Sequence, residues 1–392
     1  MEKPYKITGL RRKILSPLMD FLNDSRATGI VLIVCTIVSL VLSNIPSMQE
    51  TYLSFWQQEI HPPVSGLHLP HSILHWINDG LMVLFFFLVG MEIKRELMSG
   101  ELSSLKKSML PVLAALGGMV CPALIFALFN AGTPFHHGWG IPMATDIAFS
   151  LGILSLLGKR VPLSLKVFLT ALAIIDDLGA IVTIAIFYTS SLHIAYLLTA
   201  LAFLLIPVLL NIFKVQRLVF YFLPGIIVWY CIFNSGIHAT IAGVLLAFSI
   251  PLSRIEALEH ALSKPVNFII MPLFALANTA IVFPKEIGHV FTSPITYGIL
   301  LGLFLGKPIG ITLFSFVATR LKIAALPSGT GWKQLIGIGT IAGIGFTMSI
   351  FIATLAYQEE ALQTISKIAI IASSLLAGIC GYLYLRRQDA GK

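Results

Sequence analysis

Two carboxylic acids, Asp176 and Asp177, stand side by side in an otherwise apolar segment, residues 163–189, that is long enough to cross a membrane. A carboxylate at bilayer depth costs about 2.5–3.5 kcal/mol on insertion scales, so such a residue usually faces a cavity and has a function there. Two adjacent carboxylates should not both stay ionised without a cation nearby. Such a pair can exchange protons for a metal ion, and we expect that chemistry here. The alternative is a structural ion-pair network.

The two aspartates should point in different directions, because adjacent positions on a helix are about 100° apart. We expect Asp177 to face a cavity as the primary ion ligand, and Asp176 to face a neighbouring helix and bridge to Lys307 while the ion is absent. Na⁺ is a hard cation that prefers oxygen ligands, and Thr145 or backbone carbonyls can complete its shell. Protonation and Na⁺ binding use the same oxygens, so they should exclude each other, and the two carboxylates should titrate as a unit.

Two of the apolar segments look interrupted. Residues 141–157 contain an early proline and then the polar residue Asp146, and residues 337–345 contain four glycines. Broken helices leave backbone groups unpaired at membrane depth, with partial positive charge at N-terminal ends and partial negative charge at C-terminal ends. Asp146 should neutralise the former, and Lys307 should neutralise the latter or pair with Asp176. Close helix packing through small residues is the alternative explanation of the glycines.

The composition is that of a membrane protein. The chain is 57% hydrophobic and only 11% charged, with a mean hydropathy of +0.90, whereas soluble domains carry about 25% charged residues. Its net charge of +8 comes from short basic runs between apolar segments, so we expect a bilayer around it and no nucleic-acid partner. The four cysteines lie within apolar segments and are expected to be small buried hydrophobic residues. We expect one transmembrane domain, residues 1–392.

The expected fold is an all-α polytopic membrane protein with twelve transmembrane helices. Placing the N-terminus inside puts 23 of the 26 Lys and Arg residues in inner loops and only Lys285 in an outer one, as the positive-inside rule requires. Residues 1–26 and 386–392 are then cytoplasmic and residues 44–72 periplasmic. Spans 3–5 and 10–12 are expected to be inverted repeats with interrupted spans 4 and 11. The twelve segments are 27–45, 73–93, 108–130, 141–157, 163–189, 193–213, 218–235, 237–251, 265–283, 295–319, 334–357 and 361–385.

Titratable residues gather at two further places on the cytoplasmic side, where they are candidates for sensing pH. The alternative is interfacial anchoring by snorkelling side chains. On the outer side, Asp79 is a candidate for the cation path, and His238 is expected to be a hydrogen-bonded structural residue. The cytoplasmic candidates are Glu92, Lys94, Arg95 and Glu96 at the end of the second span, and Glu259 and His260 in a loop before the ninth.

Seven motifs, in this order along the chain, resemble those of the NhaA-type sodium/proton antiporters, a bacterial family. The resemblance runs from about residue 20 to residue 387. The motifs are 76–79 (WIND), 89–97 (VGMEIKREL), 144–149 (ATDIAF), 173–180 (AIIDDLGA), 235–240 (SGIHAT), 306–308 (GKP) and 343–350 (GIGFTMSI).

The resemblance implies a multi-pass protein of the bacterial inner membrane that exchanges cytoplasmic Na⁺ or Li⁺ for external protons. It implies electrogenic exchange, activation at alkaline pH, no cofactor and no enzymatic activity. It also implies a homodimer formed through a hairpin in residues 44–72, although strand-like alternation is poor there and Pro62 and Pro63 interrupt it.

The resemblance also carries functional roles to particular residues. It assigns ion binding to Asp176 and Asp177, with Lys307 as their partner. It assigns charge compensation to Asp146, beside Thr145. Glu92, Glu259 and their neighbours fall in the pH-sensing region, although the loop with Glu259 and His260 is shorter and poorer in histidine than is usual in the family.

Two other functions would also use intramembrane carboxylates. A passive cation channel favours rings of carboxylates from several subunits around a pore, and not one asymmetric group of Asp176, Asp177 and Lys307. An intramembrane aspartyl protease needs two aspartates on different helices that share a water, so Asp146 would have to supply the second. Proton-coupled transport without peptidase activity distinguishes the antiporter from both.

Overall fold

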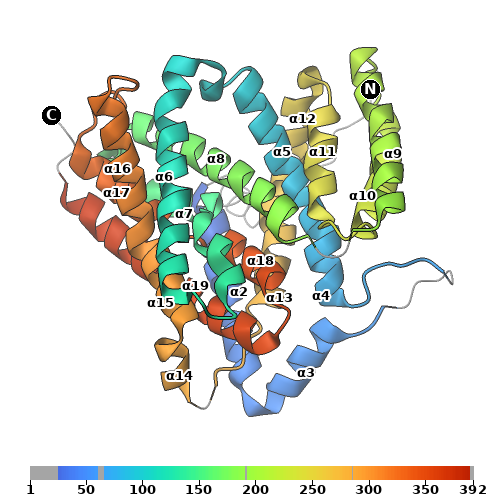
Figure 1. Ribbon diagram of the computed structural model, residues 1–392, viewed down its shortest axis with the longest axis horizontal. Helices are drawn as coiled ribbons and strands as arrows, with labels where there is room; N and C mark the ends of the chain where they lie inside the picture. Colours follow the sequence, from blue (N-terminus) through green and yellow to red (C-terminus); the bar gives the residue numbers. More distant parts are fainter. Residues whose placement is uncertain (1–24, 61–65, 190–191, 285, 389–392) are drawn as a thin grey trace, which may run out of the picture.

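The fold is all helical, as expected. The computed structural model describes residues 25–60, 66–189, 192–284 and 286–388, and among these the only β pairing is a single antiparallel bridge between Glu59 and Ser72. The helices pack side by side, with α8 running obliquely through the middle of the molecule (Figure 1). The long segments are α2 (Ser25–Asn44), α4 (Ile73–Trp76) with η1 (Ile77–Leu81) and α5 (Met82–Met98), α6 (Leu105–Asn130), η3 (His136–Met143) with α7 (Ile147–Leu156), α8 (Leu163–Phe187), α9 (Ile194–Ile212), α12 (Leu252–Pro265) with η5 (Val266–Ile270) and α13 (Met271–Asn278), α15 (Pro294–Leu301) with η6 (Gly302–Gly306) and α16 (Lys307–Arg320), α17 (Trp332–Ala342), α18 (Phe346–Ala356) and α19 (Glu360–Arg387). The shorter helices are α3 (Pro46–Gln57), η2 (Glu101–Ser103), η4 (Gly158–Arg160), α10 (Val219–Phe233), α11 (Thr240–Ser249) and α14 (Ile287–Thr292).

The helices identify a polytopic membrane protein. Nine segments in the described residues are long and apolar enough to cross a membrane, and α17 with α18, bent by 47° at their junction, makes a tenth. The apolar helices α10 and α11 fall on two further expected spans but have only 15 and 10 residues. At 1.5 Å per residue they measure about 22 Å and 15 Å, less than the roughly 30 Å of hydrocarbon in a bilayer. By length, therefore, the helices account for nine or ten of the twelve expected spans.

Both expected interruptions are present, and they lie against each other. In the first, the 3₁₀ helix η3 gives way to extended backbone at Ala144 and Asp146 before α7 begins. In the second, α17 ends at Ala342 and α18 begins at Phe346. The backbone N–H of Asp146 donates to the carbonyl oxygen of Ile344 at 2.7 Å, so the unwound segments of the two spans cross in contact.

Two segments differ from expectation. Residues 252–264 were expected to form a cytoplasmic loop, but they form α12, which continues through the π-helical η5 into α13. The run from Ser253 to Ser263 has no glycine or proline to stop a helix, and the segment passes as apolar only together with α13. Residues 44–72, in which the resemblance implies a hairpin, form a helix in their first half, α3. Residues 61–65 lie outside the described residues. The chain on either side of them projects sideways from the helices (Figure 1).

A pair of glycines lets α6 and α16 approach closely enough for their backbones to touch. A Cβ atom added at Gly310 would lie 2.0 Å from the carbonyl oxygen of Gly117, and one added at Gly117 would lie 2.2 Å from that of Gly310. Gly310 is one turn beyond Lys307, so this contact also fixes the position of the lysine. Close packing through small residues also accounts for a glycine of the eleventh span. A Cβ added at Gly343 would lie 2.4 Å from the carbonyl oxygen of Leu303.

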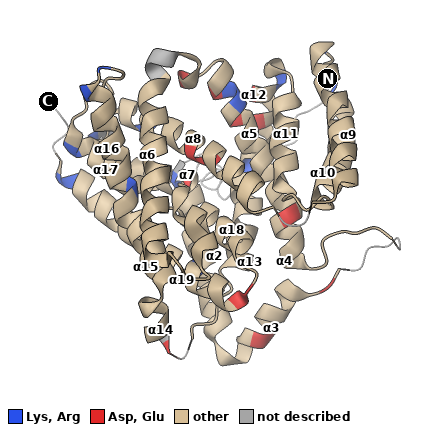
Figure 2. Ribbon diagram, viewed as in Figure 1, with Lys and Arg blue, Asp and Glu red and all other residues tan. Residues whose placement is uncertain are grey.

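The basic residues gather at one end of the helices. Figure 2 shows most Lys and Arg of the described residues at the upper end, near α12 and near the connection of α16 and α17, whereas acidic residues also occur at the lower end, on α3 and beside α14. Lys and Arg thus lie mainly at one end of the helices, as the assignment of basic residues to the loops on one side predicts.

Replacing Gly310 with alanine should force α6 and α16 apart. Overpacking of this kind typically costs about 1–3 kcal/mol of the free energy of unfolding, so the purified protein should unfold at a lower temperature than the wild type. Gly288→Ala is the matched control, because a Cβ there meets nothing within 4 Å and alanine favours a helix. Equal melting temperatures for the two variants would contradict the close approach.

Candidate functional site

Asp176, Lys307 and Thr145 form one polar group in the interior. The Lys307 ammonium is in direct contact with Asp176 Oδ2, and it donates to Thr145 Oγ1 at 2.6 Å. Thr145 Oγ1 also lies 2.8 Å from the same aspartate oxygen and 2.9 Å from the carbonyl oxygen of Ala342, the last residue of α17. Lys307 is fully buried and Asp176 is 1% exposed. Buried charges are tolerated when they are paired and hydrogen-bonded, and this group meets that condition.

Two alternatives were expected for Lys307: a pair with Asp176, or compensation of the partial negative charge at the C-terminal end of a broken helix. It pairs with Asp176, whereas it reaches the C-terminal end of α17 through the Thr145 hydroxyl. Lys307 opens α16 directly after the π-helical turn η6, which changes the direction in which the following side chains point. Such π-helical turns are frequent at functional sites.

Asp177 points away from this group and lines a cavity of about 220 Å³. The roughly 100° between neighbouring helix positions thus separates the two aspartates as expected: Asp176 faces α16, and Asp177 faces a cavity. Asp177 is 1% exposed, and the Oδ1 atoms of both aspartates are buried without a hydrogen-bond partner. An unpaired buried acceptor is costly, so these oxygens favour a proton or a cation.

The cavity supplies further oxygen atoms of the kind that hard cations bind. Its walls come from six helical segments: α2, α5, η5 with α13, α7, α8 and α18. Besides Asp177, its polar lining residues are Thr28, Glu92, Asp146, Asn267 and Thr347. Asn267 and Thr347 were not singled out in the sequence. Thr347 lies in the motif at residues 343–350, and its position on the first turn of α18, beside Asp146, is the signal that would have identified it.

Asp146 holds the N-terminal ends of two half-helices with one carboxylate. Its Oδ1 accepts from the backbone N–H of Phe149 in α7 at 2.9 Å. Its Oδ2 accepts from the backbone N–H of Thr347 in α18 at 3.1 Å and from the Thr347 hydroxyl. Both helix ends carry partial positive charge, and a negative residue is stabilising at each. All of these contacts are those expected of a charge-compensating residue at a pair of broken helices.

The candidates for sensing pH divide into three groups. Glu92 lines the cavity of Asp177. Arg95 pairs with Glu259 on α12 at 3.0 Å and with Glu96 at 3.4 Å, which ties α5 to α12. The other two residues stand apart: the Lys94 ammonium donates to the carbonyl oxygens of Phe248 and Ile250, at the end of α11, and His260 is exposed. Because α12 is a helix, Glu259 and His260 lie on a regular element, and the expectation of a loop was wrong.

Asp79 lies in a separate cluster. Its carboxylate is 3.2 Å from Nε2 of His75, and its carbonyl oxygen accepts from the Trp229 indole at 2.7 Å. It does not line the cavity of Asp177. Nearby, His238 Nε2 lies 2.8 Å from the carbonyl oxygen of Tyr188, so that nitrogen carries the proton. A structural role for His238 fits this hydrogen bond.

Comparison with known proteins identifies the family. A model of the family described as Na⁺/H⁺ antiporter 1 matches residues 19–385. The chain belongs to this family. It is 52% identical to the protein named Na(+)/H(+) antiporter NhaA 2 of Flavobacterium johnsoniae over 379 residues, which cover 95% of this chain and 93% of that one. It is 50% identical to the Na(+)/H(+) antiporter NhaA of Cytophaga hutchinsonii, over 95% of this chain and 96% of that one.

A third relative, the Na(+)/H(+) antiporter NhaA of Helicobacter pylori, is 43% identical over 95% of each chain. The resemblance recognised from seven short motifs is therefore confirmed along nearly the whole sequence of this antiporter-family member.

Replacing Asp146 with alanine should destabilise this antiporter-family protein more than loss of an ordinary helix cap. Each cap is typically worth about 1 kcal/mol, within a range of roughly 0.5–2 kcal/mol, so opening two N-terminal ends should cost about 1–4 kcal/mol of the free energy of unfolding. Asp146→Asn should cost less, because an amide oxygen still accepts a backbone N–H. Thermal unfolding of the purified variants measures both.

Ser72→Ala is the matched control, since the Ser72 hydroxyl caps one short helix, α4, through the N–H of His75 at 3.2 Å. An Asp146→Ala variant that loses no more stability than Ser72→Ala would show that the carboxylate does not hold two helices.

Proposed function

We propose that the protein is a secondary active antiporter that exchanges Na⁺ or Li⁺ for protons at Asp177. The observation that carries this proposal is the position of Asp177: a buried carboxylate with an unpaired oxygen, facing a cavity and adjacent to a lysine-paired aspartate. The relatives with 43–52% identity named above are called Na(+)/H(+) antiporters, which supports the same ions as cargo.

Competition for the carboxylates couples the two ions. A proton on Asp177 and a Na⁺ ion beside it would occupy the same oxygens, so each excludes the other. When Na⁺ enters the cavity, its charge competes with the Lys307 ammonium for Asp176, which then turns to the ion as a second ligand. On the return step, with the ion gone, Asp177 takes up a proton and the Asp176 carboxylate pairs again with the Lys307 ammonium. The electrogenic exchange that the family resemblance implies requires that a second proton also returns for each Na⁺.

The crossing of the broken helices provides the moving part. In the proposed fold, α10 and α11 are also spans, which brings the count to twelve. Spans 3–5 are then α6, η3 with α7, and α8, and spans 10–12 are α15 with α16, α17 with α18, and α19. The middle member of each trio is broken, and the two breaks meet at Asp146, which supports inverted repeats. Rocking of the crossed half-helices about Asp146 would open the cavity to either side in turn.

The charge distribution supports an orientation. The basic end seen in Figure 2 would face the cytoplasm, with both termini there and residues 44–72 in the periplasm, in a bacterial inner membrane. Glu92 lines the cavity of Asp177, one turn before Arg95 and Glu96, and Arg95 pairs with Glu259. These contacts support a role for this group in passing cytoplasmic pH to the site. Asp79 would line the outer path, and two protomers would pair through residues 44–72.

The cavity is less suited to peptide hydrolysis. An aspartyl protease would need Asp146 as the partner of Asp177, but both oxygens of Asp146 already accept backbone N–H groups of α7 and α18. An acid that holds two helix ends cannot also share a catalytic water without releasing them. The one asymmetric site, with its lysine, also differs from the rings of identical carboxylates typical of cation channels.

Asp177→Asn should abolish exchange. In everted membrane vesicles with an imposed proton gradient, Na⁺ and Li⁺ should collapse the gradient through the wild-type protein and not through the variant, because an amide neither binds a cation by charge nor exchanges a proton in this pH range. Fluorescence dequenching of a ΔpH probe is the measurement.

Glu359→Gln, at an exposed carboxylate directly before α19, is the matched control and should transport as the wild type does. Dequenching that persists in Asp177→Asn would move the ion site elsewhere. A folded wild-type protein that responds to neither cation would overturn the antiporter proposal.

A further inference from the structure

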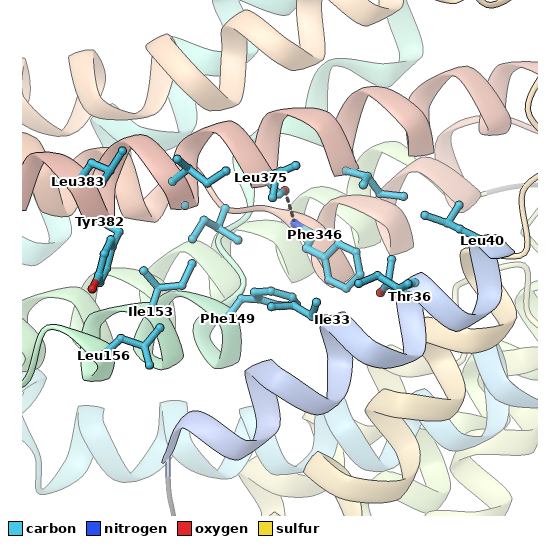
Figure 3. A pocket seen from close by; sticks show the side chains of 16 residues that line it. Ile33, Thr36, Leu40, Phe149, Ile153, Leu156, Phe346, Leu375, Tyr382 and Leu383 are labelled. Carbon is cyan, nitrogen blue, oxygen red and sulfur yellow. Dashed lines mark hydrogen bonds between the residues drawn. The ribbon is translucent and has the colours of Figure 1, made fainter.

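An apolar groove of about 570 Å³ opens on the outside of the helices between α2, α7 and α19. Figure 3 shows α2 close to α19 near Leu40 and diverging from it towards Tyr382 and Leu383, so the groove widens in that direction. Its floor is the aromatic pair of Phe149 and Phe346, whose rings pack edge to face with their centroids 4.9 Å apart.

The groove presents hydrocarbon and little else. Two of its polar residues are already satisfied within the protein: the Thr36 hydroxyl donates to the carbonyl oxygen of Leu32 at 2.7 Å, and the Ser374 hydroxyl accepts from the N–H of Phe346 at 3.1 Å (Figure 3). The α19 wall runs from Ile371 to Leu383, which at 1.5 Å per residue is about 18 Å, close to the roughly 15 Å of hydrocarbon in one leaflet. These dimensions suit one acyl chain.

Three guanidinium groups stand at the wide end. Arg386 and Arg387 follow Leu383 by one helical turn and continue its face of α19. Arg160 lies in η4, directly beyond the end of α7 at Leu156. The Arg160 side chain donates to the carbonyl oxygen of Arg386 at 2.8 Å, which brings the ends of α7 and α19 together. All three are exposed, and none forms an ion pair with a carboxylate within the described residues.

We propose that this groove binds an anionic phospholipid from the leaflet that contains the basic end of the protein. One acyl chain would lie along α19 on Phe149 and Phe346. The phosphate would be held by Arg160, Arg386 and Arg387, since guanidinium groups bind phosphate through paired, charge-assisted hydrogen bonds. Basic clusters between transmembrane helices on the cytoplasmic side are suited to anionic head groups.

The floor of the groove gives the lipid a structural effect. Phe149 and Phe346 belong to the first turns of α7 and α18, the two half-helices that Asp146 caps. A chain packed on these rings would support the crossing from the membrane side, so bound lipid should stabilise the protein. This inference does not depend on which ions are transported.

The test compares phosphatidylglycerol with phosphatidylcholine of the same acyl chains, added to the purified full-length protein in detergent. Phosphatidylglycerol should raise the apparent melting temperature by about 3 °C more than phosphatidylcholine does, and native mass spectrometry should find one tightly retained copy per chain. Arg386→Gln with Arg387→Gln should remove the preference for the anionic lipid. Ile379→Trp, which fills the groove at a 48% exposed position, should remove the retained copy.

Two matched variants control for charge and for bulk. Arg320→Gln with Lys333→Gln removes two exposed basic residues from another helix connection, and Leu376→Trp adds the same bulk to α19 at a 41% exposed position outside the groove. Both should bind lipid as the wild type does. Equal stabilisation by the two lipids, or unchanged retention in both the arginine and Ile379→Trp variants, would overturn the proposal and leave only ordinary lipid at the protein surface.

Discussion

The site depends on one carboxylate, Asp146, that holds two helix ends at membrane depth. Unwound backbone inside a bilayer is tolerated only where its polar groups find partners in the protein, and Asp146 provides them for α7 and α18 at once. The N–H of Asp146 itself closes the crossing by donating to Ile344. Thr145, its neighbour, extends the same arrangement to the end of α17 and to the pair of Asp176 and Lys307. The candidate site is therefore built where two helices are interrupted.

Unequal pairing of the two aspartates gives the site its chemistry. Asp176 has a lysine and a threonine as partners, whereas Asp177 has an unpaired oxygen beside a cavity. Without either carboxylate the cavity would have no charge to bind a cation. If both carboxylates were paired with basic residues, neither would have an oxygen available to a cation. A paired carboxylate next to an unpaired one, with oxygen donors from Thr347 and Asn267 nearby, keeps one position ready for a proton or a cation.

The sequence alone predicted this arrangement where it followed from local rules. Adjacent positions on a helix separate Asp176 from Asp177, and proline and glycine mark both broken spans. Rules of this kind do not say where packing takes a side chain. By sequence, Lys94 belongs to a group of titratable residues with Glu92 and Glu96, whereas its ammonium reaches the carbonyl oxygens at the end of α11. Residues 252–264 look like a polar loop, yet they form α12 because Ile255 and Leu258 are buried against the rest of the protein. The π-helical turns at Asp79, Asn267 and before Lys307 change the side-chain direction without a sequence signal that we recognised.

The most direct test of the account is the pH dependence of Na⁺ affinity in the purified protein, measured by isothermal titration calorimetry in buffers of different ionisation enthalpy. If Na⁺ and protons compete for Asp177 and Asp176, the Kd for Na⁺ should rise as the pH falls, by up to about tenfold per pH unit for each proton displaced, and binding should release protons to the buffer. A Kd that does not change with pH, with no proton release, would contradict exchange at shared carboxylate oxygens.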